Sequence, residues 1–144
     1  MKKIDLNKLR DKAYKTACEH GLHDQELSNE HCLCLVISEL MKAVEADRKR
    51  KYFKGKIMFE RDFNLYSALV EENVRYRNAF EKHIKDTVGD KLADTVIRLL
   101  DLAGLRNLNL NRFALVNVVS KKKTFTENIH SIVKDITNYK YTLE

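Results

Sequence analysis

The sequence predicts an all-α protein, a bundle of about four to five helices, and three observations favour that class. The 144 residues include no proline, and sheets and barrels need many tight turns built from Gly, Pro and Asn. The four glycines are widely spaced, so no glycine cluster can cradle a phosphate as in Rossmann or P-loop domains. With 44% hydrophobic and 33% charged residues the chain can fold, and its length fits one domain over residues 1–144.

Two helices are predicted in the first third of the chain, each behind a capping residue. The first covers residues 5–19, where apolar side chains recur at helical spacing behind Asp5, and Gly21 is placed to end it. After a polar connection, Ser28 can cap a second helix over residues 29–50. The predicted core side of this helix shares one face and consists of Leu33, Val36, Ile37, Leu40, Met41 and Val44.

The middle of the chain has the least regular pattern. Gly55 interrupts residues 51–70, which predicts a loop followed by helical structure from about Phe63. Residues 71–85 then follow as another helix, and its inward side chains are expected to be Val74, Phe80 and Ile84.

A strongly amphipathic helix is predicted after this region. Thr87 and Asp90 stand three residues apart, as in a capping box, and Asp90 also suits the positive end of a helix dipole. The helix is expected to run to about Ala103 and to stop at Gly104. Its predicted core side consists of Leu92, Val96, Leu99, Leu100 and Ala103.

A final helical region is expected over residues 111–139. The pattern is interrupted at residues 121–126, where Thr124 or Thr126 can cap a new start. The sequence contains no internal repeat and no low-complexity linker, which agrees with a single domain.

The net charge of +6 is concentrated in two basic clusters, residues 48–56 and 121–123. Tyr52 and Phe53 lie within the first, and basic residues with interleaved aromatics can contact nucleic acid. A solvated helix end and loop explain the same pattern, and a basic rim can also attract a triphosphate.

The sequence predicts a cytoplasmic protein without a membrane segment. No apolar run approaches the roughly 18 residues that span a bilayer, and the N-terminus lacks the apolar core of a secretory signal. Cys18, Cys32 and Cys34 form no disulfide framework, which agrees with a reducing compartment.

Acidic residues accompany the apolar stripes of the two strongest helices. One predicted helix carries Glu39 and Glu45, and the other carries Asp94 and Asp101. Two such helices packed together can hold Mg²⁺, which prefers oxygen ligands, and Mg²⁺ can assist the hydrolysis of a phosphoanhydride. The ordinary alternative is that these carboxylates are solvated.

The order of these residues resembles the MazG-like all-α nucleoside triphosphate pyrophosphohydrolases. The segments that carry the resemblance are 37–48 (ISELMKAVEADR) and 90–104 (DKLADTVIRLLDLAG), with 20–24 (HGLHD) and 80–86 (FEKHIKD) in support. The resemblance implies a helical homodimer or higher homo-oligomer. It also implies an Mg²⁺-dependent enzyme that hydrolyses nucleotides to the monophosphate and pyrophosphate.

The chain departs from the family's metal motif, which is E-E-x-x-E on one helix and E-x-x-D on a later one. Here the motifs read Ser38-Glu39-Leu-Met-Lys42 and Lys91-Leu-Ala-Asp94. Only Glu39 and Asp94 match, and the resemblance implies that they are the catalytic residues and metal ligands. Glu45 and Asp101 are the nearest carboxylates that can assist as ligands.

Lys42 and Lys91 change the charge expected at this site, because each replaces a glutamate and moves the local charge by two units. They can pair with the remaining carboxylates, or they can stand in for the metal and bind phosphate directly. The family's later phosphate-binding element is represented by Asn117 and Lys121.

Three functions therefore compete at this stage. The first is a MazG-like pyrophosphohydrolase whose activity is weakened or lost. The second is a non-catalytic nucleotide-binding protein, and the third is a helical interaction protein that contacts nucleic acid through its basic clusters. A long amphipathic helix commonly leaves an apolar face to cover, so a homodimer is expected in each case.

Overall fold

The computed structural model describes residues 4–112 and 119–138, and this part of the chain contains six α-helices, one 3₁₀ turn and no strand. The elements in chain order are α1 (Leu6–Glu19), α2 (Asn29–Arg48), α3 (Lys56–Asn64), α4 (Glu72–His83), α5 (Val88–Leu105), the turn η1 (Leu110–Arg112) and α6 (Phe125–Thr137). The all-α prediction is confirmed, with more helices than the four to five expected. None of the described helices is long and apolar enough to span a bilayer.

The predicted helix caps are confirmed. Asp5 accepts a hydrogen bond from the Lys8 amide, and Ser28 accepts one from the His31 amide, both at 3.1 Å. Thr124 begins α6 in a complete capping box, in which the Glu127 carboxylate accepts from the Thr124 amide at 2.7 Å. Each such cap stabilises a helix by about 1 kcal/mol.

The prediction of helical structure only from about Phe63 is wrong. Helix α3 begins at Lys56 and ends at Asn64, because Gly55 forms the N-cap with a φ of +113° instead of lying within a loop. The early start places Phe59 and Phe63 on the side that faces α4, where their rings lie 5.9 and 6.3 Å from the ring of Tyr76.

The prediction that Gly104 ends its helix is also wrong. Helix α5 continues to Leu105, and Asn107, with a φ of +51°, supplies the left-handed residue that ends it. Gly104 is instead the place where α1 crosses α5, because a Cβ there would lie 2.5 Å from the Cβ of Tyr14. A small residue at a close helix crossing gives the same sequence signal as a helix stop.

The continuous helix expected over residues 111–120 is not found in its described part, where residue 112 ends a 3₁₀ turn and residues 119–124 are non-helical. Residues 113–118 lie outside the described part of the chain. The restart at Thr124 is confirmed.

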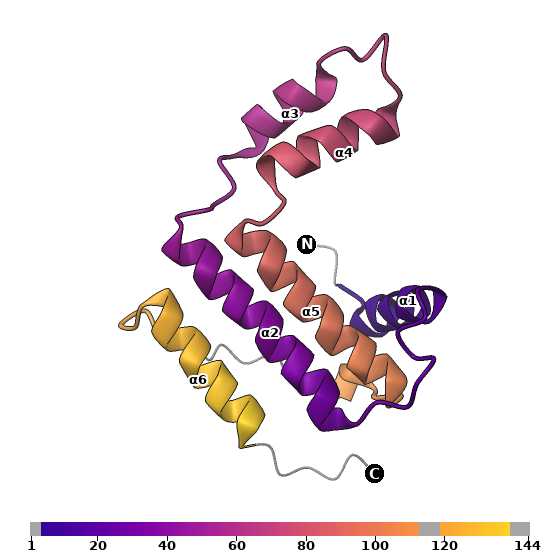
Figure 1. Ribbon diagram of the computed structural model, residues 1–144, viewed down its shortest axis with the longest axis vertical. Coiled ribbons are helices and arrows are strands. Elements are labelled where there is room, and N and C mark those ends of the chain that lie inside the picture. Colours follow the sequence, from indigo (N-terminus) through magenta and orange to yellow (C-terminus); the bar gives the residue numbers. More distant parts are fainter. Residues whose placement is uncertain (1–3, 113–118, 139–144) are drawn as a thin grey trace.

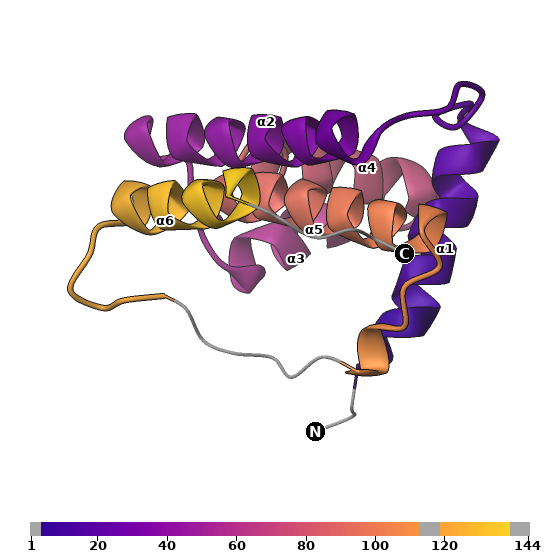
Figure 2. The ribbon, with the colours of Figure 1, turned by 90° about the horizontal axis from the view of Figure 1, so that it is seen from below.

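Helices α2 and α5 lie side by side, α6 runs along α2, and α1 crosses α5 near its C-terminal end (Figures 1 and 2). Helices α3 and α4 form a hairpin that projects from one end of this bundle (Figure 1). The tightest part of the core lies between α2 and α6, where Val36, Leu40 and Ile129 are buried. Each such side chain contributes about 1.5–3 kcal/mol.

Part of the predicted core is exposed. Val36 and Leu40 are buried as expected, but Met41 on α2 and Val96 and Leu99 on α5 are exposed. The reason is that α6 packs on α2 rather than on α5, so α1 and α2 cover only part of the apolar surface of α5.

Candidate functional site

The structure brings Glu39, Asp94 and Asp101 to one hollow between α1, α2 and α5. This hollow has a volume of about 280 Å³ and is also lined by Arg98 and Ile97. A neighbouring hollow of about 430 Å³ shares Arg98 and Asp101 with it and extends toward the loop that joins α1 to α2. Acidic residues of the two predicted helices therefore line a common hollow, as expected. We call this first hollow the acidic pocket.

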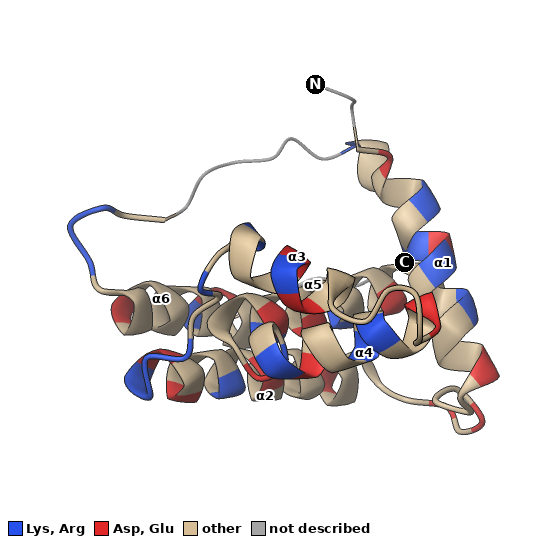
Figure 3. Ribbon diagram, turned by 90° about the horizontal axis from the view of Figure 1, so that it is seen from above, with Lys and Arg blue, Asp and Glu red and all other residues tan. Residues whose placement is uncertain are grey.

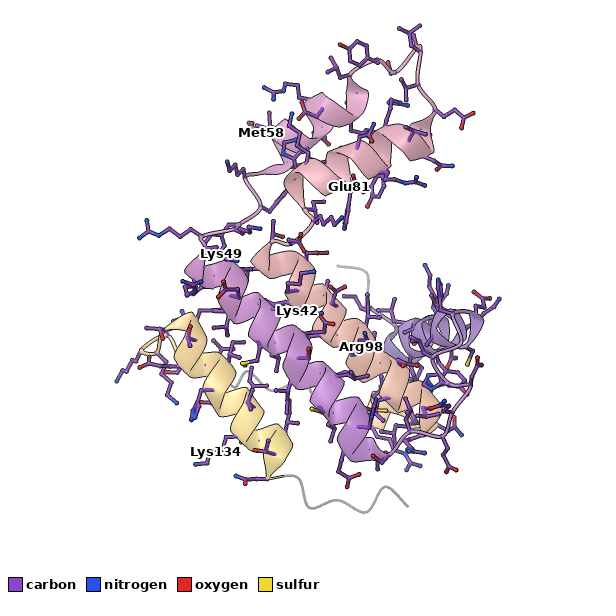
Figure 4. All side chains as sticks on the ribbon, in the orientation of Figure 1. Lys42, Lys49, Met58, Glu81, Arg98 and Lys134 are labelled. Atoms are coloured by element: carbon purple, nitrogen blue, oxygen red, sulfur yellow. The ribbon has the colours of Figure 1, made fainter. Side chains whose placement is uncertain are left out.

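Glu39 is the most buried ionisable residue of the acidic pocket, with a relative exposure of 5%. Its Oε1 lies 3.0 Å from Nζ of Lys42, one turn along α2, and 3.9 Å from Nη2 of Arg98 on α5. Its Oε2 is buried and has no hydrogen-bond partner among the described residues. Figure 4 labels Lys42 and Arg98 on the two helices concerned. A buried carboxylate needs such cations, because removing its charge from water is costly.

Lys91 gathers three carboxylates at the start of α5. Its Nζ lies 3.1 Å from Asp86, 3.3 Å from Asp90 and 3.5 Å from Asp94. Burial by itself lowers the pKa of the Lys91 ammonium, but the hydrogen bonds with Asp86 and Asp90 outweigh it and raise this pKa above its usual value. Lys91 is therefore a permanent cation in the position where the family motif has a glutamate.

Asp90 makes a different capping contact from the one expected. Thr87 caps α5 and accepts from the Asp90 amide at 3.3 Å, as predicted. The Asp90 carboxylate, however, accepts from the amide of Asp86 at 2.8 Å and not from that of Thr87, whose amide donates to Ile84. The Asp90 carboxylate thus stabilises the turn that precedes α5 and also pairs with Lys91.

Asp101 contacts His23, which lies in the segment between α1 and α2. Nε2 of His23 lies 2.7 Å from Oδ1 of Asp101, and both side chains are largely buried. The ring of Tyr14 lies 5.2 Å from that of His23 and closes this corner. His23 is separated from Asp101 by 78 residues, so no local pattern in the sequence predicts this contact.

Glu45 does not share the acidic pocket with Glu39 and Asp94. It lines a separate, open groove of about 730 Å³ together with Lys42 and Lys91. Hydrogen bonds from Arg48 and Lys49 lower the pKa of Glu45 to about 2. The carboxylate is thus ionised, and its oxygens accept bonds of 2.7–3.0 Å from those two side chains.

The later phosphate-binding candidates are not brought to these hollows. Lys121 is exposed in the turn before α6 and lines none of the three hollows described, and Asn117 lies outside the described residues. Figure 3 shows the two basic clusters as blue segments, after α2 and before α6. Arg98 is a further residue of the site for which the sequence analysis predicts no role. Its signal in the sequence is that it shares a helix face with Asp94 and Asp101.

Within residues 4–112 and 119–138, no group of three or more His, Cys, Asp or Glu side chains is placed to hold a metal ion. The chain matches no protein-family model, and no curated protein or solved structure matches it. The candidate site is therefore defined by its own geometry, which is a buried glutamate and two aspartates that contact lysine, arginine and histidine side chains.

Proposed function

We propose that this chain is a nucleotide-binding protein of the MazG-like pyrophosphohydrolase type, in which hydrolysis is weakened or lost. The resemblance of segments 37–48 and 90–104 supports the type. So do the side-by-side packing of α2 and α5, which carry these segments, and the common pocket of Glu39 and Asp94.

The observation that carries the proposal is the placement of Lys42 and Lys91. Each stands where the motif has glutamate, and each pairs with a motif carboxylate, at 3.0 Å from Glu39 and 3.5 Å from Asp94. Arg98 adds a third cation beside Glu39, at 3.9 Å from its Oε1.

This donor set does not fit Mg²⁺. A hard divalent cation is held by anionic oxygens, and here the ammonium groups of Lys42 and Lys91 lie against Oε1 of Glu39 and Oδ2 of Asp94, where their positive charges oppose a metal ion. Among the described residues, only Oε2 of Glu39 is left as a buried side-chain oxygen without a partner. Lysine ammoniums can instead hold phosphate oxygens by charge-assisted hydrogen bonds. The role proposed for these residues is therefore binding of a nucleotide rather than metal-assisted attack by water.

The proposal includes a homodimer. Val96 and Leu99 on α5 and Ile57 and Leu69 in the α3–α4 region leave apolar surface exposed on the single chain. Contiguous exposed apolar surface is typical of protein–protein interfaces. Light scattering at working concentration is expected to give twice the chain mass of 16.9 kDa, and a monomer would contradict this part of the proposal.

The central test restores two of the three missing motif carboxylates with the double variant K42E/K91E. Wild-type protein is expected to gain thermal stability from nucleoside triphosphates with or without Mg²⁺, and to gain little from Mg²⁺ alone. The double variant is expected to depend on Mg²⁺ for stability, because its carboxylates repel one another without a cation. The charge-matched control K8E/K134E changes two exposed lysines remote from the pocket and should behave like wild type.

Release of pyrophosphate from a panel of nucleoside triphosphates completes the test. Wild-type protein is expected to show little or no release. Robust turnover that E39Q or D94N abolishes would reject the weakened-enzyme proposal, and absence of any nucleotide effect on stability would reject nucleotide binding.

A further inference from the structure

We infer that the groove between the C-terminal half of α2 and the start of α5 binds the phosphate chain of a nucleotide without a divalent metal ion. This inference rests on the proposed function, because it assigns the part of the nucleotide that the protein holds and the residues that hold it. The charged side chains of this groove, which we call the basic groove, are Lys42, Lys49, Lys51, Lys91, Glu45 and Asp86.

The basic groove carries an excess of positive charge. Four ammonium groups face two carboxylates within one hollow of about 730 Å³, a volume within the range of small-molecule sites. Arg48 also binds Glu45, so that this carboxylate is shared between a groove lysine and a residue outside the groove. Carboxylates outside the groove also pair with Lys42 and Lys91, so the ammonium group on which the inference depends most is that of Lys51.

Lys51 is the ammonium with the greatest freedom to meet a ligand. Lys42, Lys49 and Lys91 each have a carboxylate within 3.5 Å, whereas Lys51 forms no ion pair within the described part of the chain. An ammonium has three donors, so the paired lysines can also add a phosphate oxygen without giving up their carboxylates.

The walls of the groove are held together by the backbone. The amide of Val88, the first residue of α5, donates to the carbonyl of Lys51 at 2.9 Å, which ties the chain after α2 to the start of α5. Lysines from both helices therefore keep a fixed spacing across the hollow. This is a property of a formed site rather than of a loose charged surface.

Both turns that border the groove contain a non-glycine residue in the left-handed region. Arg50 has a φ of +55° directly after α2, and Asp86 has a φ of +61° directly before the cap of α5. This conformation is unfavourable for a residue with a side chain, and glycine would avoid the cost. The chain thus keeps charged side chains at two positions where backbone energy favours glycine.

A compact phosphate chain fits these observations better than a nucleic-acid backbone. The phosphates of a nucleotide are joined directly, so their charges fall within one hollow. A nucleic acid spreads its charges along a strand, about 3.4 Å apart along the axis. The lysines of the basic groove, from α2, from the segment that follows it and from α5, line a single hollow.

Calorimetric titration of the full chain with inorganic tripolyphosphate in the presence of EDTA tests the inference. Wild-type protein is expected to bind, and the variant K49Q/K51Q is expected to bind at least about tenfold more weakly. The single variant K51Q removes an ammonium without an ion pair, so it should retain the fold and still weaken binding. The matched control K8Q/K134Q loses the same charge elsewhere and should stay within about twofold of wild type.

The outcomes separate the inference from the proposed function. Nucleotide binding without tripolyphosphate binding in EDTA would overturn the metal-free groove and leave the proposed function standing. Tripolyphosphate binding without binding of any nucleotide would reject the proposed function and, with it, the assignment of the groove to the phosphate chain of a nucleotide. Tighter binding of a single-stranded oligonucleotide than of tripolyphosphate, or equal effects of K51Q and K8Q/K134Q, would overturn the assignment to a phosphate chain.

Discussion

The helical bundle and the α3–α4 hairpin reach their structures by different means. The bundle of α1, α2, α5 and α6 is organised around buried aliphatic side chains, among them Val36, Leu40 and Ile129. The hairpin buries only Ala79 within α3 and α4 and relies on stacked and edge-on aromatic rings and on the charges around Asp62. Helices as short as those of the hairpin, 9 and 12 residues, are marginal in isolation.

This difference separates the region that stabilises the fold from the region that exposes apolar side chains. The buried core carries the stability, and the hairpin presents apolar surface that gains stability only when something covers it. The candidate site lies in the bundle, so changes in the hairpin should alter assembly before they alter the site.

The largest contrast is expected from the same substitution made in the two regions. Leu40 has a relative exposure of 3% and Leu69 one of 83%. L40A leaves a cavity between α2 and α6 and should lower the free energy of unfolding by about 2–5 kcal/mol. L69A should stay within about 0.5 kcal/mol, measured by urea unfolding at low protein concentration. Equal losses would show that the hairpin is part of the same core.

A smaller effect is expected where α1 meets α5. G104A forces a Cβ to within 2.5 Å of Tyr14, so it should destabilise the bundle by about 1–3 kcal/mol. Gly89, in the first turn of the same helix, has 4.0 Å of space to its nearest neighbour, Oγ1 of Thr87. G89A should therefore be neutral or stabilising by up to about 1 kcal/mol through helix propensity. Thermal unfolding of both variants decides whether Gly104 is required by packing.

The smallest effect concerns pH and the hairpin. Hydrogen bonds from Lys82 and His83 lower the pKa of Asp62 below its usual value. An acid with a lowered pKa in the folded state stabilises the fold above its unfolded pKa of about 3.9, and this contribution is lost as the pH falls below that value. D62N should lower the melting temperature at neutral pH.

The difference between D62N and wild type should shrink as the pH falls below about 4, because Asp62 is then protonated in the unfolded state, and at still lower pH in the folded state as well. The matched variant D11N changes an exposed aspartate on α1. If D62N and D11N had the same pH dependence, the charges around Asp62 would not stabilise the hairpin.

The sequence predicts the parts of this fold that depend on local chemistry. Helix starts are predictable because a short polar side chain accepts hydrogen bonds from the free amides of the first turn, whatever the tertiary structure. The residues that do so here are Asp5, Ser28, Thr87 and Thr124. The predictions based on Gly55 and Gly104 are wrong because glycine has several structural uses. It forms an N-cap at residue 55 and permits a close helix crossing at residue 104.

The candidate site is predictable to a similar extent. Helical periodicity on two helices is enough to expect that Glu39 and Asp94 lie near one another. It cannot reveal that His23 pairs with Asp101, since that contact depends on where the loop after α1 crosses α5. Periodicity also cannot reveal that Glu45 pairs with Arg48 and Lys49 in a different hollow. Residues three and four positions away in either direction along a helix are all close neighbours, so spacing does not select the partner.

Lys91 also has a mechanical consequence. Two stretches of chain connect the bundle to the hairpin, one after α2 and one before α5. The ammonium of Lys91 grips Asp86 in the second stretch, and the bond between Val88 and Lys51 joins the second stretch to the first. Lys91 and the Val88–Lys51 bond together therefore fix the place where the hairpin leaves the body of the molecule.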